Sequence, residues 1–176
     1  MTRLPRAAEI VEFHDYCLAA PGAPARFQAG LWASIEADHW HNTMLWEQAE
    51  LARRQGAPDS DIASNKRAID SHERKKIEAI ASMDAIFLEF LSATRPKAGA
   101  RLSSETAGAM VDRLSLLALH IHAMRGEAQR ADADTRQIAK KLERLQEQRS
   151  DLAGCLDRLL AESQRGESYF KVYPAD

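Results

Sequence analysis

The sequence predicts an all-α fold: an antiparallel bundle of four long helices, preceded by a short helix at the N-terminus. Apolar residues recur at helical spacing through four long segments of the chain. Glycine, proline and small polar residues cluster between those segments, where they end helices and form loops. No segment shows the alternation of apolar and polar residues that is typical of a half-buried strand. These three observations together indicate a helical bundle.

The size and composition of the chain indicate one globular domain. Its 176 residues are enough for a single hydrophobic core and few for two domains. With 45% hydrophobic and 28% charged residues, the chain has the composition of a folded protein. We therefore expect one domain over residues 1–176, which ends in an extended C-terminal tail at about 166–176.

The loop-forming clusters divide the chain into its helices. Four of them stand out: "APGAPA" (20–25), "QGAPDSD" (55–61), "TRPKAGARLSSET" (94–106) and "GEAQRADAD" (126–134). The predicted helices cover residues 5–19, 26–55, 61–94, 104–125 and about 134–164. The expected N-caps of the last three are Ser60 or Asp61, Ser103 or Ser104, and Asp132 or Asp134.

Polar and charged residues interrupt the apolar faces of these helices. On the second helix, the face with Trp32 and Ile35 also carries His39, Asn42, Trp46, Glu50 and Arg53. The corresponding polar residues are Lys66, Glu73 and Asp84 on the third helix, Asp112, Arg113 and His120 on the fourth, and Arg149 on the last. An ionised group that is buried without a partner is strongly destabilising, so these groups must pair with one another or with a ligand.

Two interpretations of the inward polar residues stay open. One is a buried salt-bridge network that sets the register of the helices, in which Arg149 pairs with Asp84, Asp112 or another interior acid. The other is a ligand pocket in the interior of the bundle. Selection for stability alone usually replaces such a network with apolar packing, which favours a pocket for the set as a whole.

A small anionic biosynthetic intermediate, such as a phosphosugar or a nucleotide sugar, is the predicted ligand. Arg53, Lys66, Arg113 and Arg149 would supply the cations. His39 and His120 are the candidate catalytic residues, because histidine titrates near neutrality. The candidate substrate-binding residues are Asn42, Trp46, Glu50, Arg53, Lys66, Asp70, Asp84, Asp112, Arg113 and Arg149. We expect His39, Asn42, Trp46 and Arg53 on one wall of a cleft, opposite Lys66, Asp84 and Arg113. An enzyme is favoured, although the residues specify neither a reaction nor a cofactor.

Metal chemistry is a weaker interpretation. The pair Glu36-x-x-His39 resembles half of a di-iron motif, but a second Glu-x-x-His is missing from the sequence. Glu47-x-x-Glu50 and Asp70-x-x-Glu73 on neighbouring antiparallel helices can hold magnesium against a pyrophosphate, so a magnesium-dependent nucleotide pyrophosphohydrolase is an alternative function. We assign no metal-binding residues.

The third alternative is a non-enzymatic partner or scaffold of a biosynthetic enzyme such as a glycosyltransferase. Trp40, Met44 and Leu51 form a second apolar stripe on the second helix, which would suit a homodimer or a partner enzyme unless that helix is buried on both sides. A net charge of −2 without a basic excess argues against nucleic acid. The N-terminus has no apolar signal core and no run reaches membrane-spanning length, so we expect a cytoplasmic protein without membrane insertion.

Five blocks of the sequence resemble the bacterial family known as domain of unknown function 4254. They read "H..N...W...E..R" (39–53), "DIA..KRAID" (61–70), "SET.G..VDRLSLLALHIHAM" (104–124), "QRSDLAGCLDRLL" (148–160) and "FKVY" (170–173). The resemblance runs from about residue 25 to 173, and its fourth-helix block is the most specific. The chain departs from the pattern of the family at 47–50, at 73–78 and at Ala107.

The resemblance implies an all-helical bacterial protein that is often encoded near glycosyltransferases of cell-envelope polysaccharide assembly. It implies no activity. The positions that match the motifs of the family are His39, Asn42, Trp46, Arg53, Lys66, Arg67, Asp70, Asp84, Glu105, Thr106, Gly108, Asp112, Arg113, Ser115, Arg149 and Asp151. Many of these are the polar residues that helical spacing places on the inner faces.

Overall fold

The computed structural model describes residues 3–54, 56, 58–130 and 134–173, and the prediction of an all-α bundle is confirmed. The helices are α1 (Ala7–Ala19), α2 (Gly30–Ala52), α3 (Asp59–Leu91), α4 (Ala107–Glu127) and α5 (Thr135–Gln164). Two short strands complete the described elements, β1 (Arg101–Leu102) and β2 (Ser168–Tyr169).

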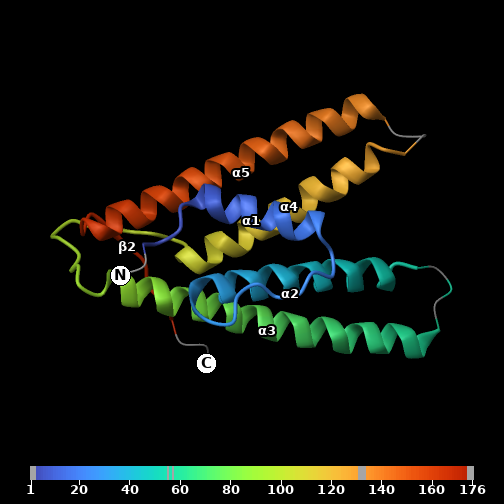
Figure 1. Ribbon diagram of the computed structural model, residues 1–176, viewed down its shortest axis with the longest axis horizontal. Coiled ribbons are helices and arrows are strands. Elements are labelled where there is room, and N and C mark those ends of the chain that lie inside the picture. The colour runs from blue at the N-terminus through green and yellow to red at the C-terminus, as the bar shows by residue number, and fades with distance from the viewer. Residues whose placement is uncertain (1–2, 55, 57, 131–133, 174–176) are drawn as a thin grey trace.

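The four long helices form two antiparallel hairpins, one of α2 with α3 and one of α4 with α5 (Figure 1). The short helix α1 packs mainly on α4 and α5 and reaches the beginning of the α2–α3 hairpin. At the ends that carry the C-terminus of α2 and the C-terminus of α4, the hairpins diverge from each other (Figure 1). Contacts between the hairpins are therefore concentrated in the body of the molecule around α1.

Side chains that accept hydrogen bonds from backbone N–H groups explain where two of the helices begin. The Thr106 hydroxyl accepts from Ala109 at 3.1 Å and caps α4, and the Asp134 carboxylate accepts from Gln137 at 3.1 Å and caps α5. The cap at Asp134 was predicted. The caps predicted for the two preceding helices were wrong: α3 begins after Pro58, and Ser103 bonds within the loop before α4. Asp132 lies outside the described residues.

The C-terminal segment is attached to the bundle through the connection between α3 and α4. The two strands pair in parallel, with Arg101 opposite Ser168. Ser103 donates its backbone N–H to Tyr169 at 2.8 Å, and Phe170 is buried in the core. Only two residues of each strand pair, which is too short for an alternating pattern to be seen in the sequence.

The apolar core lies where α1, the two hairpins and the C-terminal segment meet. Its largest fully buried apolar side chains are Ile10, Ile35, Met83, Phe87, Val111, Leu114, Ile121 and Leu156. Every helix therefore contributes to one core, as the sequence predicts for a chain of this length. In the part of the chain that the structure describes, none of the helices carries an apolar stretch of the length needed to cross a bilayer.

A close contact between α3 and α4 holds the two hairpins together. The Asp84 carboxylate of α3 accepts a hydrogen bond from the Gly108 backbone N–H in the first turn of α4, at 2.7 Å. A Cβ atom at Gly108 would lie 2.8 Å from both the Asp84 Oδ1 and the Ile80 carbonyl oxygen. Asp84 is thus a buried cap for the N-terminus of α4, where an acidic group is favourable, rather than part of a cleft wall.

Substituting Gly108 by Ala tests this contact. We expect Gly108→Ala to lower the free energy of unfolding by about 1–3 kcal/mol, because the methyl group overlaps backbone of α3 that has to move. Gly154→Ala in α5 is the matched control, since a Cβ there meets no atom within 4 Å. Alanine at Gly154 should raise the stability by about 0.5–1 kcal/mol through its helix propensity. Urea denaturation of both variants measures the difference, and equal effects would contradict the close contact.

Candidate functional site

A cluster of buried polar side chains joins α2 to α4 at the centre of the molecule. The His39 Nδ1 lies 2.8 Å from the Ser115 hydroxyl. Asn42 donates through its Nδ2 to the Asp112 carboxylate at 2.9 Å and to the Ser115 hydroxyl at 3.1 Å. His39, Asn42 and Ser115 are almost completely buried. The prediction that His39, Asn42 and Asp112 face the interior is therefore confirmed.

Asp38 and Lys76 extend this cluster toward α3. The Lys76 ammonium pairs with the Asp112 carboxylate at 3.6 Å. Asp38 is fully buried, and burial raises its pKa well above the usual range. The negative charge of Asp112 raises this pKa further, while the charge of Lys76 lowers it. Burial and the neighbouring Asp112 therefore favour the neutral form of the Asp38 carboxyl in the folded protein.

His14 of α1 covers the opposite side of His39. The two imidazole rings stack with centroids 4.5 Å apart and an angle of 18° between their planes. Burial lowers the pKa of His14 well below its usual value, and it lowers the pKa of His39 to about 4. Both rings are therefore neutral at pH 7, which allows them to stack without repulsion.

Arg149 of α5 forms an ion pair with α1. Its guanidinium donates to the Asp15 carboxylate at 2.7 Å. Only 13% of the Arg149 side chain is exposed, so the predicted buried guanidinium with an acidic partner is confirmed. The partner is neither Asp84 nor Asp112 but Asp15, whose side chain is 37% exposed. The pair therefore lies at the edge of the interior. The positive charge of Arg149 also lowers the pKa of His14.

The polar cluster contains most of the unpaired polar atoms of the interior. Among the residues that the structure describes, seven buried side-chain nitrogen and oxygen atoms lack a hydrogen-bond partner. Six of them belong to His14, Asp38, His39 and Asn42; the seventh is the Ser163 hydroxyl. Buried polar atoms are paired in the great majority of cases, so a concentration of unpaired ones points to a place that receives water or a ligand. The His39 Nε2 is one of these atoms.

A cavity of about 860 Å³ adjoins the cluster and is lined by His39. We call it the His39 cavity. It lies beneath the connection between α1 and α2, along α2, with Leu119, His122 and Ala123 of α4 on its far side. Aromatic side chains form much of its lining: Tyr16, Phe27, Trp40 and Trp46. Of the residues expected on the cleft wall of the second helix, His39 and Trp46 line this cavity.

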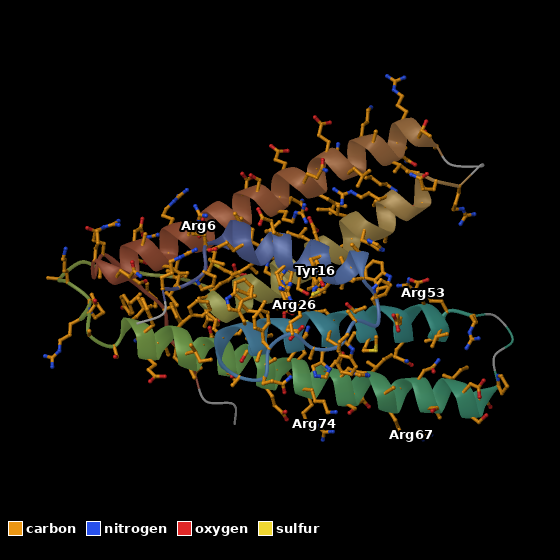
Figure 2. All side chains as sticks on the ribbon, in the orientation of Figure 1. Arg6, Tyr16, Arg26, Arg53, Arg67 and Arg74 are labelled. Carbon is orange, nitrogen blue, oxygen red and sulfur yellow. The ribbon has the colours of Figure 1, made fainter. Side chains whose placement is uncertain are left out.

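Arg26 is the positively charged side chain at the mouth of the His39 cavity. Its guanidinium carbon lies 4.8 Å from the centre of the Tyr16 ring and 5.7 Å from that of Phe27, and Figure 2 shows it beside Tyr16 where α1 meets α2. The Glu36 carboxylate accepts hydrogen bonds from the backbone N–H groups of Arg26 and Phe27 at 2.9 and 3.0 Å, and so ties the connecting loop to α2.

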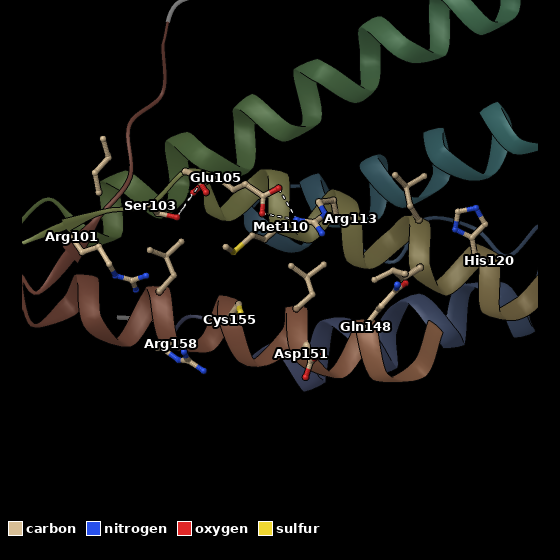
Figure 3. A pocket seen from close by; sticks show the side chains of 16 residues that line it. Arg101, Ser103, Glu105, Met110, Arg113, His120, Gln148, Asp151, Cys155 and Arg158 are labelled. Atoms are coloured by element: carbon tan, nitrogen blue, oxygen red, sulfur yellow. Dashed lines mark hydrogen bonds and ion pairs between the residues drawn. The ribbon is translucent and has the colours of Figure 1, made fainter. Parts of the chain in front are cut away.

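A second hollow of about 780 Å³ separates α4 from α5 and holds Arg113 and His120 (Figure 3). Five leucines and Met110 line it together with charged and polar side chains. Arg113 is half-exposed and donates to both carboxylate oxygens of Glu105 at 2.7 Å. His120 is exposed, and its ring contacts the edge of Trp46 at 5.0 Å. The prediction that Arg113 lies opposite His39 in one cleft was therefore wrong.

Four predicted ligand-binding residues lie on the surface: Glu50, Arg53, Lys66 and Asp70. Glu50 pairs with Arg53 along α2, and Lys66 pairs with Asp70 along α3. The Arg53 side chain is 72% exposed and that of Lys66 is 67% exposed. Figure 2 shows Arg53 at the C-terminal end of α2, where the α4–α5 hairpin has already diverged. Helical spacing identified the inner face correctly, but the partner helix does not extend far enough to bury these residues.

The geometry also bears on the metal-binding alternatives. Glu36 caps the α1–α2 connection, so the Glu36-x-x-His39 pair is explained by the loop it holds. Within the described residues, the structure contains no group of three or more His, Cys, Asp or Glu side chains that could hold a metal ion. Glu47, Glu50, Asp70 and Glu73 are accordingly not gathered into such a group.

Sequence reasoning missed four residues that complete the site, which are His14, Arg26, Asp38 and Lys76. Ser115 was named as a position that matches the family but not as a candidate site residue. Ser115 lies three residues after Asp112 and shares its helix face, and His14 follows Ile10 at helical spacing, so both carried a signal. Arg26 carried none, because it belongs to a loop whose path the sequence does not define.

The fold and the site together define a helical-bundle protein with a buried polar centre beside an aromatic cavity. The chain belongs to the family described as "Protein of unknown function (DUF4254)", whose model matches residues 32–172. The resemblance of the five sequence blocks to this family is thereby confirmed. Neither a curated protein nor a solved structure matches the chain.

The two buried histidines predict a loss of stability in acid. Unfolded histidine titrates near pH 6.5, whereas His39 in the folded protein has a pKa of about 4. Between these values the unfolded state binds more protons, so the free energy of unfolding falls as the pH falls. For His39 alone, the loss between pH 6.5 and 4 should be about 3 kcal/mol.

The His39→Gln variant isolates this effect. Asp38 has the opposite influence, because its raised pKa makes the folded state bind protons more readily in acid. The informative quantity is therefore the difference between wild type and His39→Gln, measured by urea denaturation from pH 7 to pH 4. From pH 7 to pH 4, the free energy of unfolding of wild type should fall by about 3 kcal/mol relative to that of His39→Gln. A constant difference would contradict the buried neutral imidazole.

The Arg149–Asp15 pair predicts an asymmetry between its two members. Asp15→Ala leaves a mostly buried guanidinium without a partner and should cost about 3 kcal/mol. Arg149→Leu leaves a carboxylate that water reaches and should cost about 1 kcal/mol. Thermal and urea unfolding of both variants measure the difference. Equal costs would mean that the guanidinium is as well hydrated as the acid.

Proposed function

We propose that the protein binds a small anionic biosynthetic intermediate, such as a phosphosugar or a nucleotide sugar, in the His39 cavity. The observation that carries this proposal is the unpaired Nε2 atom of His39, a side chain that is 98% buried and yet lines the cavity. A buried polar atom without a partner beside an open space is the usual mark of a binding site. The position of His39 within the polar cluster supports this assignment.

The lining of the His39 cavity favours a ligand with a ring and a negative charge. Trp40, Trp46 and Tyr16 offer flat apolar faces against which a sugar or a base can pack. Arg26 supplies a cation at the mouth; it contacts aromatic rings, and none of the ion pairs found in the described residues includes it. Arg26 thus takes the place that the sequence analysis gave to Arg53 and Lys66.

If the protein is an enzyme, His39 is the residue that we place against the reacting atoms of the ligand. Its neutral ring at pH 7 follows from the pKa of about 4, and the ring touches both the polar cluster and the cavity. His120 lies in the separate hollow between α4 and α5, so it does not complete an acid–base pair with His39. A ligand in the His39 cavity would approach His120 only across the Trp46 ring.

A non-enzymatic partner of a biosynthetic enzyme is the second candidate function. It is favoured by Trp40, which is 51% exposed, and by Tyr16, which is also exposed; both lie at the cavity. Aromatic residues that combine apolar area with exposure are common in protein interfaces. Under this reading a segment of the partner would enter the cavity. A cytoplasmic location, expected from the sequence, suits both candidates.

A thermal-shift screen against phosphosugars, nucleotides and nucleotide sugars tests the proposal. A ligand at a hundred times its Kd should stabilise the fold by about 2.7 kcal/mol. Arg26→Gln and His39→Gln should weaken the response of the same ligand by tenfold or more in Kd, since each removes one contact to the anion. Arg53→Gln is the matched control, because it removes a cation that lies on the surface.

Two outcomes would contradict the proposal. One is a screen in which every ligand leaves the melting temperature unchanged while the protein is folded. The other is a ligand whose Kd responds to Arg53→Gln as strongly as to Arg26→Gln, which would place the binding site outside the His39 cavity. A stable complex with a partner enzyme that survives Trp40→Ala would place the interface of the second candidate function outside the cavity.

A further inference from the structure

We infer that Asp112, Asn42 and Ser115 hold the neutral His39 ring with its proton on Nε2, so that His39 presents a hydrogen-bond donor to the cavity. The site would then select ligands that place an acceptor oxygen, such as a phosphoryl or carboxylate oxygen, against that nitrogen. The choice of ligand rests on the proposed function, whereas the position of the proton does not. Three contacts carry the inference, and each constrains the next.

The first contact orients the amide of Asn42. Its Nδ2 lies 2.9 Å from the Asp112 carboxylate, which is paired with Lys76. A carboxylate accepts hydrogen bonds and cannot donate them. The reversed amide would place the Asn42 carbonyl oxygen against this carboxylate, where two acceptors would repel each other. Asn42 therefore directs its amino group, with two N–H donors, toward Asp112 and its surroundings.

The second contact determines the role of the Ser115 hydroxyl. The same Asn42 amino group lies 3.1 Å from the Ser115 Oγ and donates its second proton to it. A hydroxyl has a single proton of its own to donate. Of the contacts found within the described residues, the one acceptor within reach of that proton is the His39 Nδ1, at 2.8 Å. Ser115 therefore donates to His39.

The third contact leaves the His39 proton on the other ring nitrogen. A Nδ1 that accepts from Ser115 uses its lone pair and carries no hydrogen, and a neutral imidazole then holds its hydrogen on Nε2. The opposite tautomer would make Ser115 accept twice and leave the hydroxyl proton without an acceptor in a buried place. Burial keeps the pKa of His39 low, at about 4, so the neutral form is the one present at pH 7.

As a consequence, His39 presents a hydrogen-bond donor, and not an acceptor, at the wall of the cavity. The Nε2–H group has no partner in the described structure and His39 lines the cavity, so an acceptor atom of the ligand completes its hydrogen bond. In this state His39 stabilises negative charge on an oxygen and cannot take up a proton from the ligand, because its lone pair is held by Ser115. Asp112, Asn42 and Ser115 are positioning residues: they act on the ligand through His39.

Long-range proton–nitrogen NMR of protein labelled with ¹⁵N-histidine tests the inference at pH 7 without any ligand. His39 should show an unprotonated Nδ1 and a protonated Nε2, and its signals are identified because they vanish in His39→Gln. In Ser115→Ala the preference should be lost, with both nitrogens shifting toward averaged values. Ser163→Ala is the matched control, because it removes a buried hydroxyl outside the cluster and should leave the His39 signals unchanged.

A protonated Nδ1 of His39 in the wild-type protein, with its signals assigned from the folded His39→Gln variant, would overturn the inference. An unchanged tautomer in Ser115→Ala, with the variant folded, would also overturn it. The result is separable from the ligand screen. A protonated Nε2 together with a failed screen would leave the inference standing and remove the proposed function, and a bound phosphosugar with a protonated Nδ1 would do the reverse.

Discussion

The attachment of α4 to α3 is the contact on which the site depends. Asp84 accepts from the first turn of α4, and Gly108 is there because any side chain would collide with the backbone of α3. This contact sets how deeply α4 enters the groove beside the α2–α3 hairpin. Asp112 and Ser115 follow one and two turns later on the same helix, so their approach to Asn42 and His39 is determined at Gly108.

The interior carries little net charge in spite of its many titratable groups. Burial removes the charge from His14 and His39 and disfavours it on Asp38, whereas Lys76 and Asp112 offset each other. Arg149 and Asp15 form a second pair at the edge. Desolvation thus converts what the sequence presents as a charged core into a set of mostly neutral donors and acceptors, which a low-dielectric interior tolerates far better than isolated ions.

The sequence predicted the fold and the inward position of part of the candidate site for a physical reason. Helical spacing reports which face of a helix is inward, so His39, Asn42 and Asp112 were identified correctly. It does not report how far the neighbouring helix extends, which is why Arg53 and Lys66 proved to be exposed. Whether an inward-facing residue is buried depends on which helix packs beside that part of its own helix. The path of the loop that brings Arg26 to the cavity depends on tertiary packing in the same way.

The mostly neutral interior in turn limits how an anionic ligand can be held. A negative charge that entered the polar cluster itself would meet the Asp112 carboxylate, with Lys76 already paired to it. Among the described residues that line the cavity, Arg26 is the one Lys or Arg, and none of the ion pairs found in the described residues includes it; the neutral imidazole of His39 and the acidic Glu36 and Glu47 line the cavity as well. A ligand that fits this arrangement of Arg26 and the neutral His39 ring has its full negative charge toward Arg26. Its uncharged part packs against Trp46, and its innermost oxygen needs only the dipole of one N–H group. A sugar ring that carries a single phosphate or a longer phosphate chain toward the loop has this distribution of charge, whereas a compact dianion buried beside His39 does not.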